Sequence, residues 1–217
     1  MKVVYAYDAL CGWCYGFSPV IEAFHQKYQH EYERIEVLSG GMIIGDRIGP
    51  IGEVAAYIKD AFKTVEDRCS VKFGEAFLRD ILDEGSALFT SLPAAIALNI
   101  VKNEKPELAL SFASALQKGV YFDGIKPAEY PAFAELASQP AFGFEKGDFL
   151  HKMELAQNHQ DAEADFKACS QVYGVNGFPT VFLIDEEKMS GVQLCRGYAT
   201  LDHLEKAYEA AKEQLAG

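Results

Sequence analysis

Two cysteines near the start of the chain, Cys11 and Cys14, are separated only by Gly12 and Trp13. A short apolar run of strand length, residues 3–7, precedes them, and apolar side chains follow at helical spacing. That downstream stripe consists of Phe17, Ile21, Phe24 and Tyr28. Two thiols at this spacing, where a strand gives way to a helix, predict a redox pair at a helix N-terminus.

The first thiol of the pair is the expected nucleophile. The first N–H groups of a helix have no intrahelical partner, so they favour a thiolate at Cys11. A helix terminus contributes about 0.3 to 2 kcal/mol, and neither Gly12 nor Trp13 adds a charge. We therefore expect Cys11 to be moderately activated.

A second motif lies far along the chain, at residues 175–180, which read Val-Asn-Gly-Phe-Pro-Thr. A strand-like apolar run, residues 181–184, follows it directly. Proline at the first edge of a strand removes a ladder donor, and proline in a tight turn there is typical of a cis peptide bond. The motif predicts a cis Pro179 before a late strand.

Together these motifs resemble the thioredoxin fold, and the long segment between them is similar to the DsbA-like branch of dithiol-disulfide oxidoreductases. Pro19, inside the expected active-site helix, strengthens the resemblance. The resemblance implies an α/β thioredoxin-like fold with a helical domain inserted between the second strand and the cis-proline half. It predicts a thioredoxin-like domain formed by residues 1–45 and 158–217, and a helical insert over residues 46–157.

The resemblance also implies roles for single residues. Cys11 matches an exposed nucleophile, Cys14 a buried resolving cysteine, and Phe178 a residue that offers backbone groups to an extended peptide. The expected substrate-binding residues are Trp13, Phe178, Pro179 and Thr180. Protein or peptide disulfides and dithiols are the implied substrates, with a cellular thiol reductant or glutathione as redox partner and no bound cofactor or metal.

Two positions depart from the family pattern. Many relatives place a buried acidic residue on the first strand below the second cysteine, where this chain has Tyr5. Asp8 is the nearest carboxylate, although an aspartate at a strand end is more often a turn or cap residue. Strong oxidants and isomerases of this fold tend to have a histidine between the cysteines, which is missing here. The direction of electron flow therefore stays open.

Composition narrows the class of protein. The chain has 217 residues, of which 49% are hydrophobic and 24% charged, as in a globular protein with a substantial core. A net charge of −12 argues against nucleic acid and anionic membrane surfaces as partners. No run approaches the roughly 18 apolar residues of a membrane span. Because the first residues pass directly into a strand and leave no room for a signal peptide, we expect a cytoplasmic protein.

The other cysteines, Cys69, Cys169 and Cys195, are widely spaced and stand mostly among apolar residues. Disulfides are rare in a reducing cytosol, so we expect these three to be buried free thiols. A structural zinc site needs four ligands, and one CxxC pair with no second pair does not supply them.

Periodicity and cap signals predict the remaining elements. They are a strand over 34–38, helical stripes over 51–62 and 73–81, a helix capped by Ser91 with Pro93 in its first turn, a helix ended by Gly119, a helix over 161–173, two strands flanking 185–190, and a last helix capped by Thr200.

Three functions fit these patterns. The first is a thiol-disulfide oxidoreductase or isomerase. The second is a glutathione-dependent transferase or isomerase similar to the kappa class, in which serine is typical at the position of Cys11. The third is a peptide-binding chaperone whose activity does not depend on the thiols.

Overall fold

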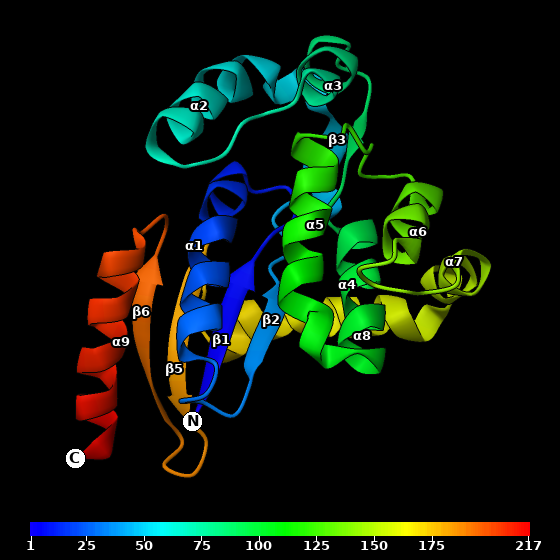
Figure 1. Ribbon diagram of the computed structural model, residues 1–217. Coiled ribbons are helices and arrows are strands. Elements are labelled where there is room, and N and C mark those ends of the chain that lie inside the picture. Colours follow the sequence, from blue (N-terminus) through cyan, green and yellow to red (C-terminus); the bar gives the residue numbers. More distant parts are fainter.

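The computed structural model describes residues 1–217 and contains a four-stranded sheet in the order β2-β1-β5-β6, with helices on both faces (Figure 1). β1 runs parallel to β2 and antiparallel to β5, and β5 runs antiparallel to β6. The strands are β1 (Lys2–Tyr7), β2 (Ile35–Ser39), β5 (Thr180–Asp185) and β6 (Ser190–Arg196).

The helices are α1 (Gly12–Tyr28), α2 (Ala55–Arg68), α3 (Glu75–Phe77), α4 (Leu92–Glu104), α5 (Ala109–Tyr121), α6 (Tyr130–Ser138), α7 (Lys146–Glu154), α8 (Ala156–Lys167) and α9 (Leu201–Ala216). A second sheet pairs two very short strands, β3 (Gly49–Pro50) and β4 (Leu88–Phe89). No helix combines the length and the apolar character needed to cross a lipid bilayer.

Alternate residues of β1 enter two hydrophobic layers. Val3, Tyr5 and Tyr7 belong to the main core, while Val4 and Ala6 belong to a smaller cluster on the opposite face. Helices α1 and α9 cover the first face, and α8 with the turn after it lies against the second (Figure 1). Because both faces are covered, β1 is apolar at nearly every position and ends in a buried loop rather than at the surface.

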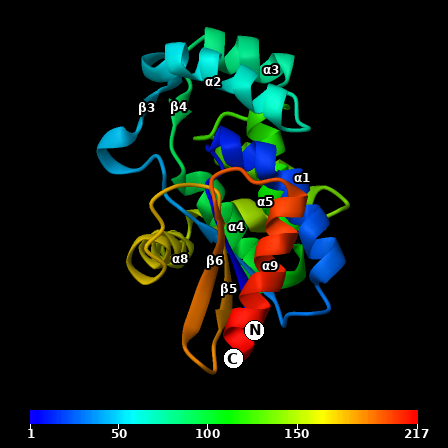
Figure 2. The same ribbon diagram turned by 90° about the vertical axis from the view of Figure 1, so that its left-hand side faces the viewer.

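The chain between β2 and β5 is mostly helical. Helices α2 and α3 stand across the end of the molecule where α1 begins, while α4 and α5 pack deeper in the molecule (Figure 2). The β3–β4 pair lies within the predicted insert and was not predicted, because two-residue strands leave no periodic pattern. The domain boundaries at residues 45/46 and 157/158 stay a prediction.

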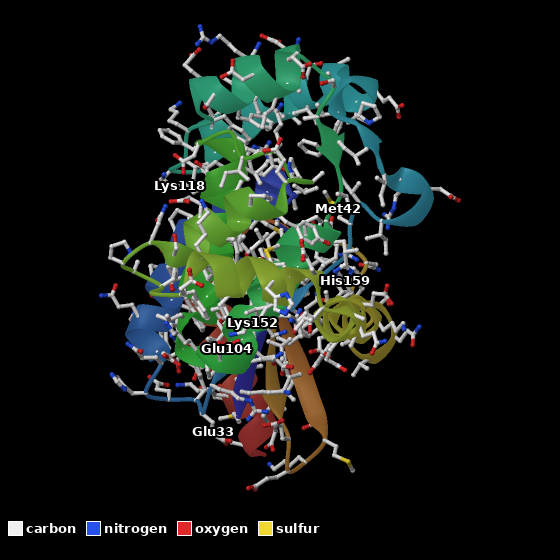
Figure 3. All side chains as sticks on the ribbon, turned by 90° about the vertical axis from the view of Figure 1, so that its right-hand side faces the viewer. Glu33, Met42, Glu104, Lys118, Lys152 and His159 are labelled. Atoms are coloured by element: carbon white, nitrogen blue, oxygen red, sulfur yellow. The ribbon has the colours of Figure 1, made fainter.

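A buried ion pair fastens α8 to α4. Lys102 Nζ lies 2.7 Å from Asp165 Oδ2, which also accepts the N–H of Ser39 at 3.2 Å. Burial raises the pKa of Asp165, and the contact with Lys102 works against that rise. On the surface, Lys152 of α7 pairs with Glu104 of α4 at 2.8 Å (Figure 3). Polar contacts thus join α4 to α7 and to α8, and α8 to the end of β2.

Several predicted elements are confirmed. The second strand begins one residue later than predicted, and two strands flank the turn after residue 185. Thr200 Oγ1 accepts the N–H of His203 at 3.3 Å and caps α9.

Three details of the predicted helices were wrong. Helix α5 continues through Gly119 to Tyr121, so Gly119 does not end it. Ser91 precedes α4, but its hydroxyl does not cap the helix because it bonds elsewhere. The helix predicted over 161–173 begins at Ala156, and its last turns, residues 168–172, are π-helical.

Candidate active site

Cys11 is the N-cap residue of α1, with extended backbone at φ −94° and ψ 109°. Its Sγ accepts the N–H of Cys14 at 3.4 Å. The CxxC spacing places Cys14 in the third helical position, where the N–H has no intrahelical partner. The first turn of α1 contains no acidic side chain. The helix start therefore favours negative charge on the Cys11 sulfur.

The loop before β5 approaches the same sulfur from the other side. The Phe178–Pro179 peptide bond is cis, and Cys11 Sγ lies 3.7 Å from the carbonyl oxygen of Phe178, to which the thiol donates. Cys11 and Phe178 are 167 positions apart in the sequence. The structure thus brings together the two motifs that the sequence singles out.

The ring of Phe178 packs against the end of β2. A Cβ built on Gly40 would lie 2.0 Å from Cζ of that ring, so only glycine leaves room for it there. This contact fixes the loop whose carbonyl oxygen faces Cys11.

Both thiols of the pair are buried. Cys11 is 7% exposed and Cys14 is 0% exposed, so the prediction of an exposed Cys11 was wrong. Cys11 lines an apolar cavity together with Trp13 and residues of α2. Burial raises the pKa of the Cys14 thiol well above its usual value, and the Cys11 side chain raises it further. Cys14 is therefore a thiol in the resting protein.

The side chains of Trp13 and Thr180, two of the predicted substrate-binding residues, make different contacts. The Trp13 ring faces Tyr198, with centroids 6.3 Å apart. Thr180 is buried, and its hydroxyl donates to the carbonyl oxygen of Gly177 at 2.8 Å. Because β5 is paired with β1 and β6, Thr180 has strand partners on both sides. The Thr180 side chain therefore holds the proline loop in place, and Phe178 lies before the paired part of the strand.

Asp8, at the end of β1, is 1% exposed and organises the loop before Cys11. Its carboxylate accepts the N–H of Leu10 at 2.9 Å, which is the turn interaction that the sequence predicts. It also accepts the N–H of Met42 at 2.7 Å and the hydroxyl of Ser91 at 3.0 Å. Burial raises the pKa of Asp8, and these hydrogen bonds oppose the rise.

Two side chains of α5 hold the same loop. The Tyr121 hydroxyl donates to the Leu10 carbonyl oxygen at 2.5 Å, and Gln117 Nε2 donates to the Asp8 carbonyl oxygen at 3.2 Å. Gln117 Oε1 accepts the hydroxyl of Ser18, one turn beyond Cys14 on α1, at 2.7 Å. The insert therefore positions the CxxC loop by hydrogen bonds from Ser91, just before α4, and from Gln117 and Tyr121 of α5.

No protein-family model matches the sequence, and a search of curated proteins gave no match. Solved structures do match. A candidate protein disulfide isomerase from Nitrosomonas europaea is 20% identical with a TM-score of 0.81, over 98% of each chain. DsbM, a cytosolic disulfide reductase from Pseudomonas aeruginosa, is 23% identical with a TM-score of 0.76, over 100% of this chain and 99% of that one. DsbA from Chlamydia trachomatis is 14% identical with a TM-score of 0.60, over 100% and 88%. The chain has the DsbA-like thioredoxin fold.

In this DsbA-like fold, three of the residues that hold the CxxC loop were not predicted as site residues. Ser91 was interpreted only as a helix cap. Gln117 carried a usable signal, because it lies four residues after Ala113 and three before Val120, on the apolar face of α5. A polar side chain at such a position needs a buried partner.

Tyr5 stands where many proteins of the DsbA-like fold carry an acidic residue. Tyr5 is 1% exposed. Its hydroxyl has no hydrogen-bond partner, and neither have the buried hydroxyls of Tyr7 and Tyr208. Burial raises the pKa of the Tyr5 hydroxyl well above its usual value, and the Cys14 thiol raises it further. Tyr5 therefore stays protonated and supplies no base.

The three other cysteines are buried and unpaired, as predicted. Cys169 Sγ donates to the Ser39 carbonyl oxygen at 3.5 Å, and Cys195 lies in β6 beside Val181. Burial raises the pKa of Cys169 and of Cys195 to about 12. No group of three or more histidine, cysteine or acidic side chains is arranged to hold a metal ion.

Proposed function

We propose that this chain is a thiol-disulfide oxidoreductase that acts on protein or peptide disulfides. The observation that carries the proposal is the position of Cys11 Sγ, 3.4 Å from the Cys14 N–H and 3.7 Å from the Phe178 carbonyl oxygen. A thiol at a helix start, a second thiol one turn on and a free backbone edge beside them are the parts that disulfide exchange requires. The DsbA-like fold supports the assignment.

In the first step the Cys11 thiolate attacks one sulfur of a substrate disulfide. A mixed disulfide forms, the substrate S–S bond breaks, and the released substrate sulfur leaves as a thiolate that takes up a proton. The carbonyl oxygen of Phe178 and the segment before β5 face an extended peptide, which binds through main-chain hydrogen bonds. These main-chain hydrogen bonds do not themselves depend on the side chains of the peptide.

In the second step Cys14 loses its proton and attacks the Cys11 sulfur. The Cys11–Cys14 disulfide forms and the second substrate thiol leaves, so the substrate gains two electrons and two protons. The raised pKa of Cys14 keeps this thiol protonated until the mixed disulfide has formed next to it. The reverse sequence oxidises a dithiol substrate, and the redox partner sets the direction.

A cellular thiol such as glutathione is the proposed redox partner. Two molecules of glutathione reduce the Cys11–Cys14 disulfide and leave as glutathione disulfide. DsbM has also been solved with glutathione, and that structure has a TM-score of 0.74 to this chain at 23% identity. We also propose that the protein is cytoplasmic, since glutathione is abundant there.

A redox titration tests the proposal. Trp13 is the only tryptophan and lies between the two cysteines, so its fluorescence is expected to change as glutathione buffers oxidise the pair. A midpoint near the cytosolic poise, about −220 to −320 mV, indicates reduction or isomerisation, and one near about −120 mV indicates oxidation. Fluorescence and thiol count that do not respond to the buffer would contradict the proposal.

Two serine variants separate the thiol roles. Cys14→Ser is expected to accumulate a mixed disulfide with a peptide substrate, and Cys11→Ser is expected to form none. The double variant addresses the chaperone alternative. If it still prevents aggregation of an unfolded protein while insulin reduction is lost, peptide binding is independent of the thiols.

A further inference from the structure

An apolar cavity of about 260 Å³ lies beside Cys11. Of its fifteen lining residues, fourteen are hydrophobic, and none carries a charge. The lining includes Cys11 and Trp13, then Met42 and Phe89, and Ala61 of α2. Figure 3 places Met42 directly below the segment that carries α2 and α3. The nucleophilic sulfur thus shares a wall with an apolar space.

The apolar surface continues outward from the cavity. Val54 and Tyr57 belong to its lining and are 48% and 73% exposed. Val65 is the only buried residue of α2, although several apolar side chains of this helix face the cavity. Large apolar side chains that remain exposed together around a hollow mark a binding surface.

We infer that this cavity is a specificity subsite that receives one large apolar side chain, next to the reacting cysteine of a peptide disulfide. The inference rests on the proposed function. When a substrate sulfur reaches Cys11, the residue next to that substrate cysteine lies within reach of the cavity, because Cys11 is itself part of the cavity lining. Phe178, whose carbonyl oxygen contacts Cys11 Sγ, lies outside the cavity lining, so a peptide backbone paired there leaves the cavity free for a side chain.

The volume of the cavity and its uncharged lining favour a single apolar side chain over other ligands. The volume is below the roughly 300 to 1,000 Å³ typical of pockets for drug-sized ligands, so it suits a single side chain. Glutathione carries two carboxylates and an ammonium group, and the lining offers no charged partner for any of them. A phenylalanine, leucine or methionine side chain leaves water on entering the cavity and needs no polar partner.

Two peptides test the inference without any change to the protein. They are symmetric disulfide dimers that differ only in the residue after cysteine, which is phenylalanine in one and serine in the other. Reduced protein is mixed with each, and the rate is followed by Trp13 fluorescence and by release of peptide thiol. Burial of one aromatic side chain predicts a second-order rate about 10- to 100-fold higher for the phenylalanine peptide.

A cavity-filling variant provides the second arm. Ala61→Phe is expected to reduce the ratio of the two rates at least tenfold, because the new ring occupies the subsite. Ala56→Phe is the matched control, since Ala56 is exposed on the same helix and lies outside the lining; it is expected to keep the wild-type ratio. Thermal unfolding of both variants checks that they are folded.

The outcomes are distinct. Equal rates for the two peptides with wild-type protein, or a ratio that Ala61→Phe leaves unchanged in a folded protein, would overturn the subsite. Reaction with neither peptide would contradict the proposed function itself, since the serine peptide needs no subsite.

Discussion

The hydroxyl of Tyr121, on helix α5, donates a hydrogen bond of 2.5 Å to the carbonyl oxygen of Leu10, the residue before Cys11. Both residues are buried, and they lie 111 positions apart. The peptide group that precedes the nucleophile is therefore held by a side chain of the insert. Gln117 and Ser91 donate hydrogen bonds to Asp8, and so does the N–H of Met42. With the Tyr121 bond, four hydrogen bonds from distant segments therefore hold the loop before Cys11.

Removal of the Tyr121 hydroxyl is expected to destabilise the protein. Tyr121→Phe keeps the ring contacts with Phe73 and Phe77 but leaves the Leu10 carbonyl oxygen without its partner. We expect a loss of about 1 to 2 kcal/mol in the free energy of unfolding, measured by urea denaturation. Tyr208→Phe is the matched control, because the Tyr208 hydroxyl is buried and has no partner. It should be neutral or stabilising, and equal losses for both variants would disprove the role of the hydrogen bond.

Gln117 is expected to matter both for stability and for the rate of exchange. Gln117→Leu removes the bonds to the Asp8 carbonyl oxygen and to the Ser18 hydroxyl. Each group loses one partner and keeps another, because the Cys11 N–H still donates to the Asp8 carbonyl oxygen and the Ser18 hydroxyl still reaches the Cys14 carbonyl oxygen. We therefore expect a loss of about 1 to 2 kcal/mol in unfolding free energy and slower insulin reduction. Ser111→Ala, at an exposed position of the same helix, is the control and should change stability by less than about 0.5 kcal/mol. A Gln117→Leu variant as stable as the control would refute this assignment.

Cys14 is expected to react only at high pH. Burial raises its pKa, so the thiolate fraction stays low at neutral pH and grows as pH rises. In a Cys11→Ser variant, alkylation of Cys14 by iodoacetamide, followed by peptide mass mapping, should increase about tenfold per pH unit without a plateau below pH about 9. The same variant unfolded in urea should reach half its maximal rate near pH about 8.5. If the alkylation rate had the same pH dependence in the folded and the unfolded variant, the fold would not raise the pKa of Cys14.

Gly40 is expected to tolerate no side chain while Phe178 is present. A Cβ at this position would meet the ring of Phe178 at 2.0 Å, so Gly40→Ala must displace the ring or the strand end. We expect a cost of about 1 to 3 kcal/mol in unfolding free energy. In a Phe178→Ala background the same substitution should cost much less, and the difference gives the coupling of the two residues. Additive effects in this double-mutant cycle would rule out the contact.

The sequence alone determined the local parts of the site. The strand, the CxxC pair and the helix after it are contiguous, and strand and helix periods reveal them without any knowledge of the rest of the chain. Pro179 before a late strand was found in the same way. The resemblance built on these motifs predicted the fold that the structural comparisons support.

The tertiary structure decided what surrounds Cys11. Periodicity shows that α5 has an apolar face, but it does not show that Gln117 on that face bonds to the carbonyl oxygen of Asp8. Periodicity likewise gives no sign that Cys11 is buried beside an apolar cavity that residues of α2 also line. The physical reason is that local pattern depends on neighbours within a turn or a strand, whereas burial and polar partners depend on which distant segments pack together. Four consecutive residues were enough to predict that Cys11 and Cys14 form a pair, but the residues that surround the pair come from the whole chain.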